Sequence, residues 1–223
     1  MFARADAVLQ AAGGSYADVV RTWIYMADIL QWYDEFNPVR GALYSQFAES
    51  RQTDSSWPPA STGIEGRAPG GAHCLMDLFA VGGPGRGDVS IQALRNPRQS
   101  EAYGYGSAFS RGMAVTFDNL QTVHVSGTAA VDEEGRSACV GDLRGQVDHT
   151  LDNIASLLNT QHMTLDDFVS STIFTKPGYD AKLVRELIGH RSELMANSIR
   201  VAADVCRPEL LFEVDGVAVR TCD

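Results

Sequence analysis

The chain has 223 residues, of which 28 are acidic and 18 are basic, so its formal net charge is −10. Hydrophobic residues make up 44% of it and charged residues 21%, which is typical of a folded globular protein rather than a disordered one. Binding to nucleic acid by charge needs a basic stripe, and here scattered basic residues are outnumbered by acids, so we expect no nucleic-acid partner.

Membrane and leader signals are missing from the sequence. No stretch reaches the run of about 18 apolar residues that a membrane span needs. The first residues form an amphipathic pattern rather than a basic and then apolar leader. We therefore expect a soluble, cytoplasmic protein without a membrane partner.

The cysteines and histidines show no ligand spacing. No CxxC pair occurs, and no two histidines are spaced as HxxxH, so we predict neither a metal site nor a cofactor. Reduced and mostly buried thiols are expected instead. The cysteines concerned are Cys74, Cys139, Cys206 and Cys222.

The first half of the chain alternates between helical and strand patterns. Apolar spacing predicts a helix around residues 7–11, and a β-rich run follows at 22–26. A second amphipathic helix is expected over 32–47. An apolar strand that carries one acid, Asp77, closes this half at 75–79.

The second half repeats this α-β-α-β order after two additional strand-like runs. Its predicted elements, in chain order, are strands at 114–116 and 122–126, a helix with apolar residues from Leu151 to Leu158, a strand at 171–175, a helix over 181–195 and a strand at 210–214 that carries Glu213. A glycine-rich stretch separates the halves. We predict a first unit at 1–82 that lacks its leading β-hairpin, a linker at 83–95 and a complete second unit at 96–223.

Short motifs in the second half resemble the RidA/YjgF superfamily. They are Val125-Ser126-Gly127-Thr128-Ala129, then Asp132 and Gly135, and later Gln146 with Leu151-Asp152-Asn153-Ile154. The resemblance covers residues 96–220 in full and 2–82 in truncated form. It implies an α+β fold of two RidA-like units, each a chorismate-mutase-like β-α-β-α-β sheet with two helices on one face. It also implies a homo-oligomer, with a trimer favoured.

The deaminase branch of that superfamily is a poor match. Its imine deaminases hold the substrate carboxylate with the arginine of a Pro-Ala-Arg-Thr motif, and this chain has Ser61 in that place. Arg200 lies near the corresponding segment of the second half, but out of register. Since a serine does not replace a bidentate guanidinium, a standard 2-iminobutanoate deaminase is disfavoured.

The chorismatase branch is similar in more of its motifs. These are Asn96-Pro97-Arg98-Gln99, Ala102-Tyr103, Ser126-Gly127-Thr128-Ala129, Val205-Cys206-Arg207 and Leu210-Leu211 with Glu213. The resemblance implies that Glu213 is the catalytic acid/base and that Cys206 lines the pocket. A longer Tyr-Gly-Pro-Arg segment of that branch is shortened here, and Arg111 stands where it can partly compensate for the missing arginine.

The candidate site follows from these residues and their chemistry. A glutamate buried in an apolar strand stays protonated, and can give a proton to a vinyl ether and then take one from water. The alternative is an ion pair of Glu213 with a nearby arginine, or exposure to solvent. The predicted substrate-binding residues, each of which has a simple packing or surface alternative, are Arg98, Tyr103, Tyr105, Arg111, Gly127 and Cys206.

The function implied by the resemblance is hydrolysis of a small anionic metabolite that bears a carboxylate. The expected reaction is chorismatase-like cleavage of an enolpyruvyl ether, with Glu213 as general acid/base. Two alternatives remain open at this point: a RidA-type imine or enamine deaminase, and a non-catalytic protein that binds a ligand or regulates.

Overall fold

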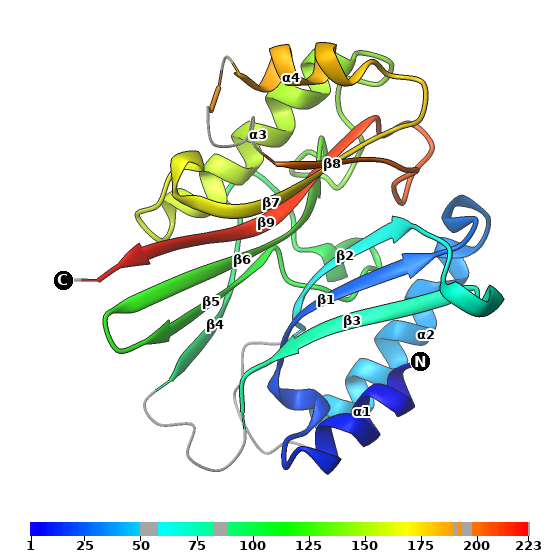
Figure 1. Ribbon diagram of the computed structural model, residues 1–223, viewed down its shortest axis with the longest axis vertical. Helices are drawn as coiled ribbons and strands as arrows, with labels where there is room; N and C mark the ends of the chain where they lie inside the picture. Colours follow the sequence, from blue (N-terminus) through cyan, green and yellow to red (C-terminus); the bar gives the residue numbers. More distant parts are fainter. Residues whose placement is uncertain (50–57, 83–88, 190, 193–197, 223) are drawn as a thin grey trace.

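The chain folds into two β-sheets that face each other, with helices on the two outer sides (Figure 1). This computed structural model describes residues 1–49, 58–82, 89–189, 191–192 and 198–222. The arrangement is the α+β fold with helices on one face of each sheet that the sequence predicts. No helix in these ranges is both long and apolar enough to cross a membrane.

The first sheet has the strand order β2-β1-β3. Strand β1 pairs with β2 in parallel and with β3 in antiparallel direction. Its elements are α1 (Phe2–Ala11), β1 (Val19–Met26), α2 (Ile29–Glu49), β2 (Ala60–Glu65) and β3 (Cys74–Ala80). Both helices pack on one face through an apolar cluster that includes Phe2, Leu9, Ile24, Phe36 and Tyr44. The opposite face, which carries Arg21 and Trp23, is directed toward the second sheet.

The second sheet has the order β4-β5-β6-β9-β7-β8. Its strands are β4 (Ser90–Leu94), β5 (Gly112–Phe117), β6 (Leu120–Ala129), β7 (Phe168–Thr175), β8 (Ile199–Ala202) and β9 (Phe212–Thr221). The helices α3 (Leu143–Asn159) and α4 (Ala181–Gly189) cover its outer face. Strand β4 lies within the range 83–95 that the sequence predicts as linker. It forms a strand because it pairs with β5 along its whole length.

The two sheets share one three-strand arrangement. In the second sheet β7 pairs with β8 in parallel and with β9 in antiparallel direction, as β1 does with β2 and β3. Strands β5 and β6 continue the second sheet beyond β9. In the described part of the first half, β3 has no such neighbour.

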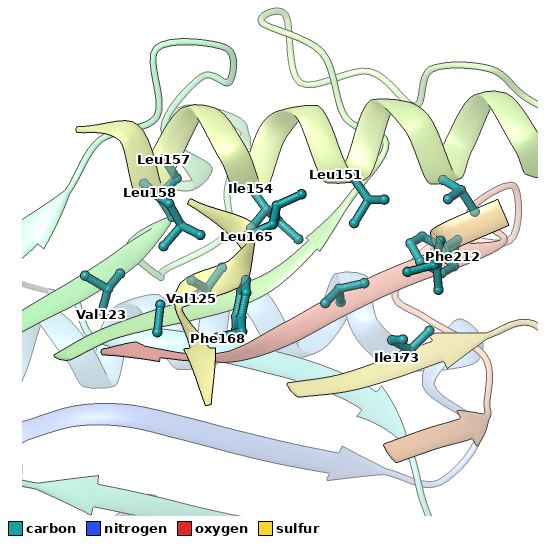
Figure 2. Close-up of a cluster of buried hydrophobic side chains, with 14 of the residues drawn as sticks. Val123, Val125, Leu151, Ile154, Leu157, Leu158, Leu165, Phe168, Ile173 and Phe212 are labelled. Carbon is teal, nitrogen blue, oxygen red and sulfur yellow. The ribbon is translucent and has the colours of Figure 1, made fainter. Parts of the chain in front are cut away.

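The main apolar core lies between α3 and the second sheet (Figure 2). Leu151, Ile154 and Leu158 are spaced at helical intervals and are fully buried against strand residues such as Val125 and Phe212. The periodicity of α3 therefore correctly predicts which of its faces is buried.

A second set of apolar contacts joins the facing sheets. Val20 and Ala60 from the first half pack against Met113 and Val115 from the second. Isolated bridges also tie β2 to the second half, at Ala60 with Ser110 and at Ile64 with Val205. Strand β2 is thus the edge of the first sheet that contacts the second half, and a group of buried polar residues lies beside it.

Candidate active site

Glu213 lies near the start of β9 on the face directed toward the first sheet. Its side chain is only 4% exposed. Burial raises the pKa of Glu213 to about 8, the negative charge of Asp215 adds to the rise, and Arg21 opposes it. No hydrogen bond from any described residue contributes to this shift. At neutral pH the group is therefore a protonated carboxylic acid with free hydrogen-bonding capacity.

A β-bulge in β6 brings the backbone against this acid. The register between β6 and β9 shifts between Val125 and Thr128, so that Ser126 and Gly127 are both opposite Asp215. A Cβ atom on Gly127 would lie 2.3 Å from the Oε1 atom of Glu213. Only a glycine therefore leaves the carboxyl group room at this position.

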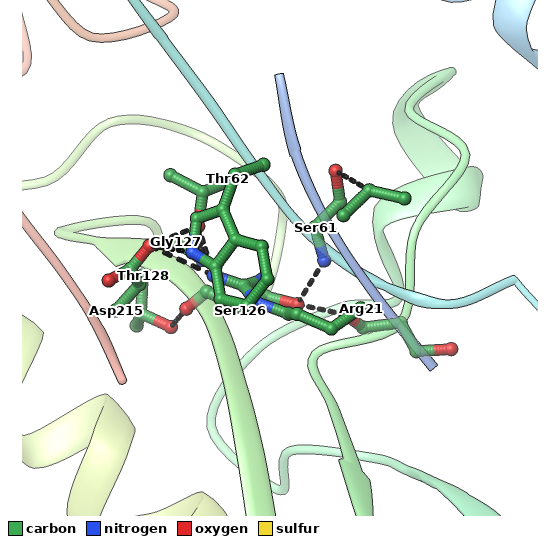
Figure 3. A network of polar contacts seen from close by, with 10 residues as sticks. Arg21, Ser61, Thr62, Ser126, Gly127, Thr128 and Asp215 are labelled. Carbon is green, nitrogen blue, oxygen red and sulfur yellow. Dashed lines mark hydrogen bonds and ion pairs between the residues drawn. The ribbon is translucent and has the colours of Figure 1, made fainter. Parts of the chain in front are cut away.

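A buried polar network crosses from this bulge to the first sheet (Figure 3). The N–H of Gly127 donates to Thr62 Oγ1 at 3.1 Å, and the Thr62 hydroxyl donates to Asp215 Oδ2 at 2.7 Å. The same carboxylate oxygen accepts from Arg21 Nη2 at 2.9 Å and from Trp23 Nε1 at 3.1 Å. Arg21 also donates to Thr62. Sequence reasoning missed this network, because its members come from both halves of the chain.

Cys206, in the loop before β9, and Tyr33 of α2 are further groups near Glu213. The pKa of the Cys206 thiol is raised to about 12, mainly by burial and in addition by the charge of Glu213. The Tyr33 hydroxyl likewise has a raised pKa, first from burial and then from the charges of Cys206 and Glu213. Both groups are therefore neutral, and Cys206 is a packing residue rather than a thiolate nucleophile. It packs against apolar clusters of both halves.

Arg40 is a second buried cation of this region, besides Arg21. It is 1% exposed and lies over the rings of Phe36, at 5.4 Å, and Phe109, at 5.6 Å. Its Nη2 donates to Asn37 Oδ1 at 2.7 Å, and its Nε has no partner among the described residues. The charge of Arg40 lowers the pKa of both Tyr33 and Cys206, so it lies within electrostatic reach of both.

The sequence does carry a signal for Arg40. The residue sits between Phe36 and Tyr44 at intervals of four, on the apolar stripe of α2 that packs into the core. An arginine on such a stripe is unusual, because a buried charge requires compensation.

Comparison with known proteins supports the fold and the motifs. The profile of the endoribonuclease L-PSP family matches residues 106–220, more than half of the chain. The chain belongs to this family, the RidA/YjgF superfamily.

Relatives of this RidA-family chain include two proteins of Streptomyces hygroscopicus. A 3-hydroxybenzoate synthase is 27% identical over 231 residues, which cover 92% of this chain and 64% of that protein. A chorismatase is 26% identical over 225 residues, covering 91% and 62%. The chain thus spans 62–64% of the length of these curated relatives.

A crystal structure of a chorismatase has the same fold as this RidA-family chain. It matches with a TM-score of 0.76 at 24% identity, covering 96% of this chain and 67% of that one. The likeness therefore extends over both sheets rather than over the second one alone.

Not all predicted residues of this RidA-family chain reach the Glu213 cluster. Arg98 is half-exposed, pairs with Asp152 of α3 at 3.8 Å and lines an open groove of about 590 Å³ on the outer side of that helix. Arg111 is buried, but its Nε and Nη2 both donate to the carbonyl oxygen of Ser100, at 3.0 and 2.6 Å. The alternative in which Glu213 forms an ion pair with Arg98 is not seen in the structure, since Arg98 lies beside α3 and pairs with Asp152.

The two predicted tyrosines lie on a short 3₁₀ turn, Ala102–Tyr105. Tyr103 is 52% exposed, and the side chain of Tyr105 lies outside the described part of the structure. Asp77, the counterpart of Glu213 in the first half, is exposed on β3. Of the predicted residues, the structure thus brings together Glu213, Gly127 and Cys206, and it adds Arg40 and Tyr33.

Proposed function

We propose that this chain is a chorismatase-like hydrolase. It hydrolyses the enolpyruvyl ether of a small anionic metabolite, of which chorismate is the expected example, and needs no metal or cofactor. The observation that carries the proposal is Glu213, a buried acid whose pKa is raised to about 8 and whose carboxyl group lies against the glycine of a bulge. The names of the chorismatase relatives support it.

The chemistry needs one acid that changes its protonation state. Protonated Glu213 gives its proton to the terminal methylene carbon of the enol ether, which leaves an oxocarbenium ion at the ether carbon. A water molecule adds to that carbon while the Glu213 carboxylate takes a proton from it. The resulting hemiketal then breaks its C–O bond, which yields pyruvate and an alcohol and leaves Glu213 protonated again.

Arg40 is the group best suited to hold a substrate carboxylate. A buried guanidinium without an acidic partner among the described ion pairs is costly, and a bound anion would compensate it. The planar fork of an arginine matches a carboxylate in a bidentate manner. The neutral hydroxyl of Tyr33 adds a donor beside it. In this proposal Arg40, rather than Arg98, holds the carboxylate, and the predicted contribution of Arg111 stays a prediction.

The two alternatives have less support from the site. For an imine deaminase, the carboxylate-binding arginine would occupy position 61, but Ser61 there is buried and accepts a hydrogen bond from Thr22 at 2.9 Å. For a non-catalytic binding protein, no role explains a buried glutamic acid without a hydrogen bond from the described residues. The homotrimer and the cytoplasmic location remain predictions.

The test compares Glu213→Gln with the wild type. Chorismate is incubated with each protein, and pyruvate is followed by a coupled lactate dehydrogenase assay, with 2-iminobutanoate as a parallel substrate. We expect chorismate turnover by the wild type and a loss of about 100- to 10,000-fold in kcat for Glu213→Gln, the usual contribution of a general acid–base. The matched control is Glu186→Gln, an exposed glutamate of α4, with unchanged rates.

Each contrary result has a definite meaning. Pyruvate release that survives in Glu213→Gln would disprove the role of this acid. Turnover of the imine without turnover of chorismate would favour the deaminase. Chromatography of the second product then shows whether it is a dihydroxylated ring or 3-hydroxybenzoate, the compound named by the other relative.

A further inference from the structure

We infer that Asp215 is a positioning residue for Glu213, and that together with Arg21 and Thr62 it couples the first sheet to the acid. The inference rests on the proposed function, in which Glu213 is the acid. It assigns a task to a buried ion pair that neither the motifs nor the relatives point to. It also explains why the acid depends on residues of both halves.

The first observation is the placement of the two carboxyl groups. Asp215 follows Glu213 by two residues on β9, so both side chains lie on the same face of the strand. They are 2% and 4% exposed, respectively. Two acids this close in a buried environment do not both ionise readily. The surroundings therefore decide which of them carries the charge.

Donors are concentrated on Asp215. One carboxylate oxygen, Oδ2, accepts from Arg21 Nη2, Thr62 Oγ1 and Trp23 Nε1, at 2.9, 2.7 and 3.1 Å. All three donors come from β1 and β2, in the opposite sheet. Charged donors and several hydrogen bonds favour the ionised form of a carboxyl group. Asp215 is thus the anion of the pair, and the proton stays on Glu213.

Thr62 joins the two acids through the backbone. Its hydroxyl donates to Asp215 and accepts from the N–H of Gly127, so its orientation is determined by both partners. Gly127 lies directly against the Glu213 carboxyl group. Asp215 is therefore connected to Glu213 through the Thr62 hydroxyl and the Gly127 backbone. These hydrogen bonds hold the β6 bulge against the Glu213 carboxyl group.

Other charged or titratable groups around the acid do not take over this task. Arg21 opposes the effect of Asp215 on the pKa of Glu213, and Cys206 and Tyr33 are neutral. His124, on β6 of the same face, stays neutral because burial and Arg21 lower its pKa to about 4. Arg40 lies on α2, on the side of Tyr33 and Cys206. Asp215 is thus the neighbouring anion that adds to the effect of burial in keeping Glu213 protonated.

Neutralising Asp215 and neutralising Arg21 are expected to shift the pKa of Glu213 in opposite directions. Asp215→Asn removes the anion and leaves Arg21 to attract the ionised form of Glu213, so the pKa of Glu213 falls. Arg21→Gln removes the cation and leaves the anion, so the pKa of Glu213 rises. If the Arg21–Asp215 ion pair only held the two sheets together, both substitutions would lower stability. They would not shift the pKa of Glu213 in opposite directions.

The experiment measures the pKa of Glu213 directly. Protein labelled with ¹³C at the glutamate side-chain carboxyl is titrated by NMR, and the Glu213 signal is assigned by its loss in Glu213→Gln. We expect a decrease of at least about 1 pH unit in Asp215→Asn and an increase in Arg21→Gln. Asp148→Asn, which alters an exposed acid of α3, is the control without a shift. Shifts of the same sign in both variants, or no shift in folded protein, would overturn the inference.

Activity gives the second readout. The alkaline limb of the kcat/KM profile moves to lower pH in Asp215→Asn and to higher pH in Arg21→Gln. Should these variants not fold, Thr62→Val is expected to lower kcat about 10-fold or more, and Thr62→Ser to recover most of the loss; equal kcat for Thr62→Val and wild type would overturn the inference. Because the NMR titration needs no turnover, failure of chorismate hydrolysis would disprove the proposed function without deciding this inference.

Discussion

At the scale of single residues, the site depends on how charges are buried. Glu213, Asp215, Arg21 and Arg40 are all at most 4% exposed. Asp215 and Arg21 compensate each other in an ion pair. Glu213 avoids its charge by staying protonated, and Arg40 is left with an amide and two aromatic rings. Within the described residues neither Glu213 nor Arg40 is in an ion pair, and these are the two groups that the proposed substrate engages.

The raised pKa of Glu213 predicts a pH-dependent stability. In the unfolded chain a glutamate ionises with a pKa of about 4.3, whereas folded Glu213 keeps its proton up to about pH 8. Between these values the folded state binds more protons, so the free energy of unfolding falls as pH rises, by up to about 1.4 kcal/mol per pH unit. Glu213→Gln lacks this loss, so its stability relative to the wild type is greater at pH 8 than at pH 5.

Urea denaturation at the two pH values measures this difference, with Glu186→Gln as the control that shows none. A relative stability of Glu213→Gln that stays constant from pH 5 to pH 8 would mean that Glu213 ionises with an ordinary pKa. It would then not serve as the general acid at neutral pH.

Arg40 is expected to affect substrate binding more than the chemical step. A hydrogen bond to a charged group contributes about 1.5–3 kcal/mol, so Arg40→Met should raise KM about 10- to 100-fold. Arg40→Lys, which keeps the charge without the planar fork, should lie between that variant and the wild type. The measurement is the KM for chorismate, with Arg144→Met on the exposed side of α3 as the control. An unchanged KM in Arg40→Met would exclude Arg40 as the carboxylate anchor.

At the scale of elements, helices and apolar strands follow the sequence pattern closely. Helix α3 buries the face that its apolar spacing predicts, and β9 begins within the predicted apolar run. Strand β2 was not predicted, because Ala60–Glu65 contains mostly small and polar residues. It becomes a strand because it pairs with β1 in parallel direction and is buried against the second half of the chain. A local sequence pattern reveals neither of these contacts.

The bulge in β6 is an element-scale feature with a sharp test. In Gly127→Ala the new methyl group would meet the Glu213 carboxyl at 2.3 Å, so either the acid or the bulge must move. We expect a loss of about 10-fold or more in kcat and a destabilisation of about 1–3 kcal/mol, as for overpacked sites. The variables are kcat for chorismate and the free energy of unfolding in urea.

Gly41→Ala provides the matched control for that substitution. Gly41 lies in α2, and apart from the adjoining helix backbone no atom lies within 4 Å of the added carbon, so activity should be unchanged and stability unchanged or slightly higher. Wild-type activity in Gly127→Ala would show that close backbone approach at the acid is unnecessary.

At the scale of the whole molecule, the two sheets form one site because they face each other. Glu213 and Gly127 come from the second sheet, whereas Thr62, Trp23 and Arg21 come from the first. Apolar contacts such as Val20 with Met113 hold the faces together beside this network. In the described structure the first sheet is the smaller one, with three strands against six, and β3 forms its open edge.

The sequence by itself determined the family, the α+β class and most helices and strands, and it singled out Glu213, Gly127 and Cys206, which the structure places side by side. These features are local, because periodicity and short motifs depend on residues close together in the chain. Only the tertiary structure revealed Arg40, the Asp215 network, strand β2 and the position of Arg98 on the outer side. The physical reason is that the state of a charge depends on what faces it in space, and here those partners lie up to 194 residues apart in the chain.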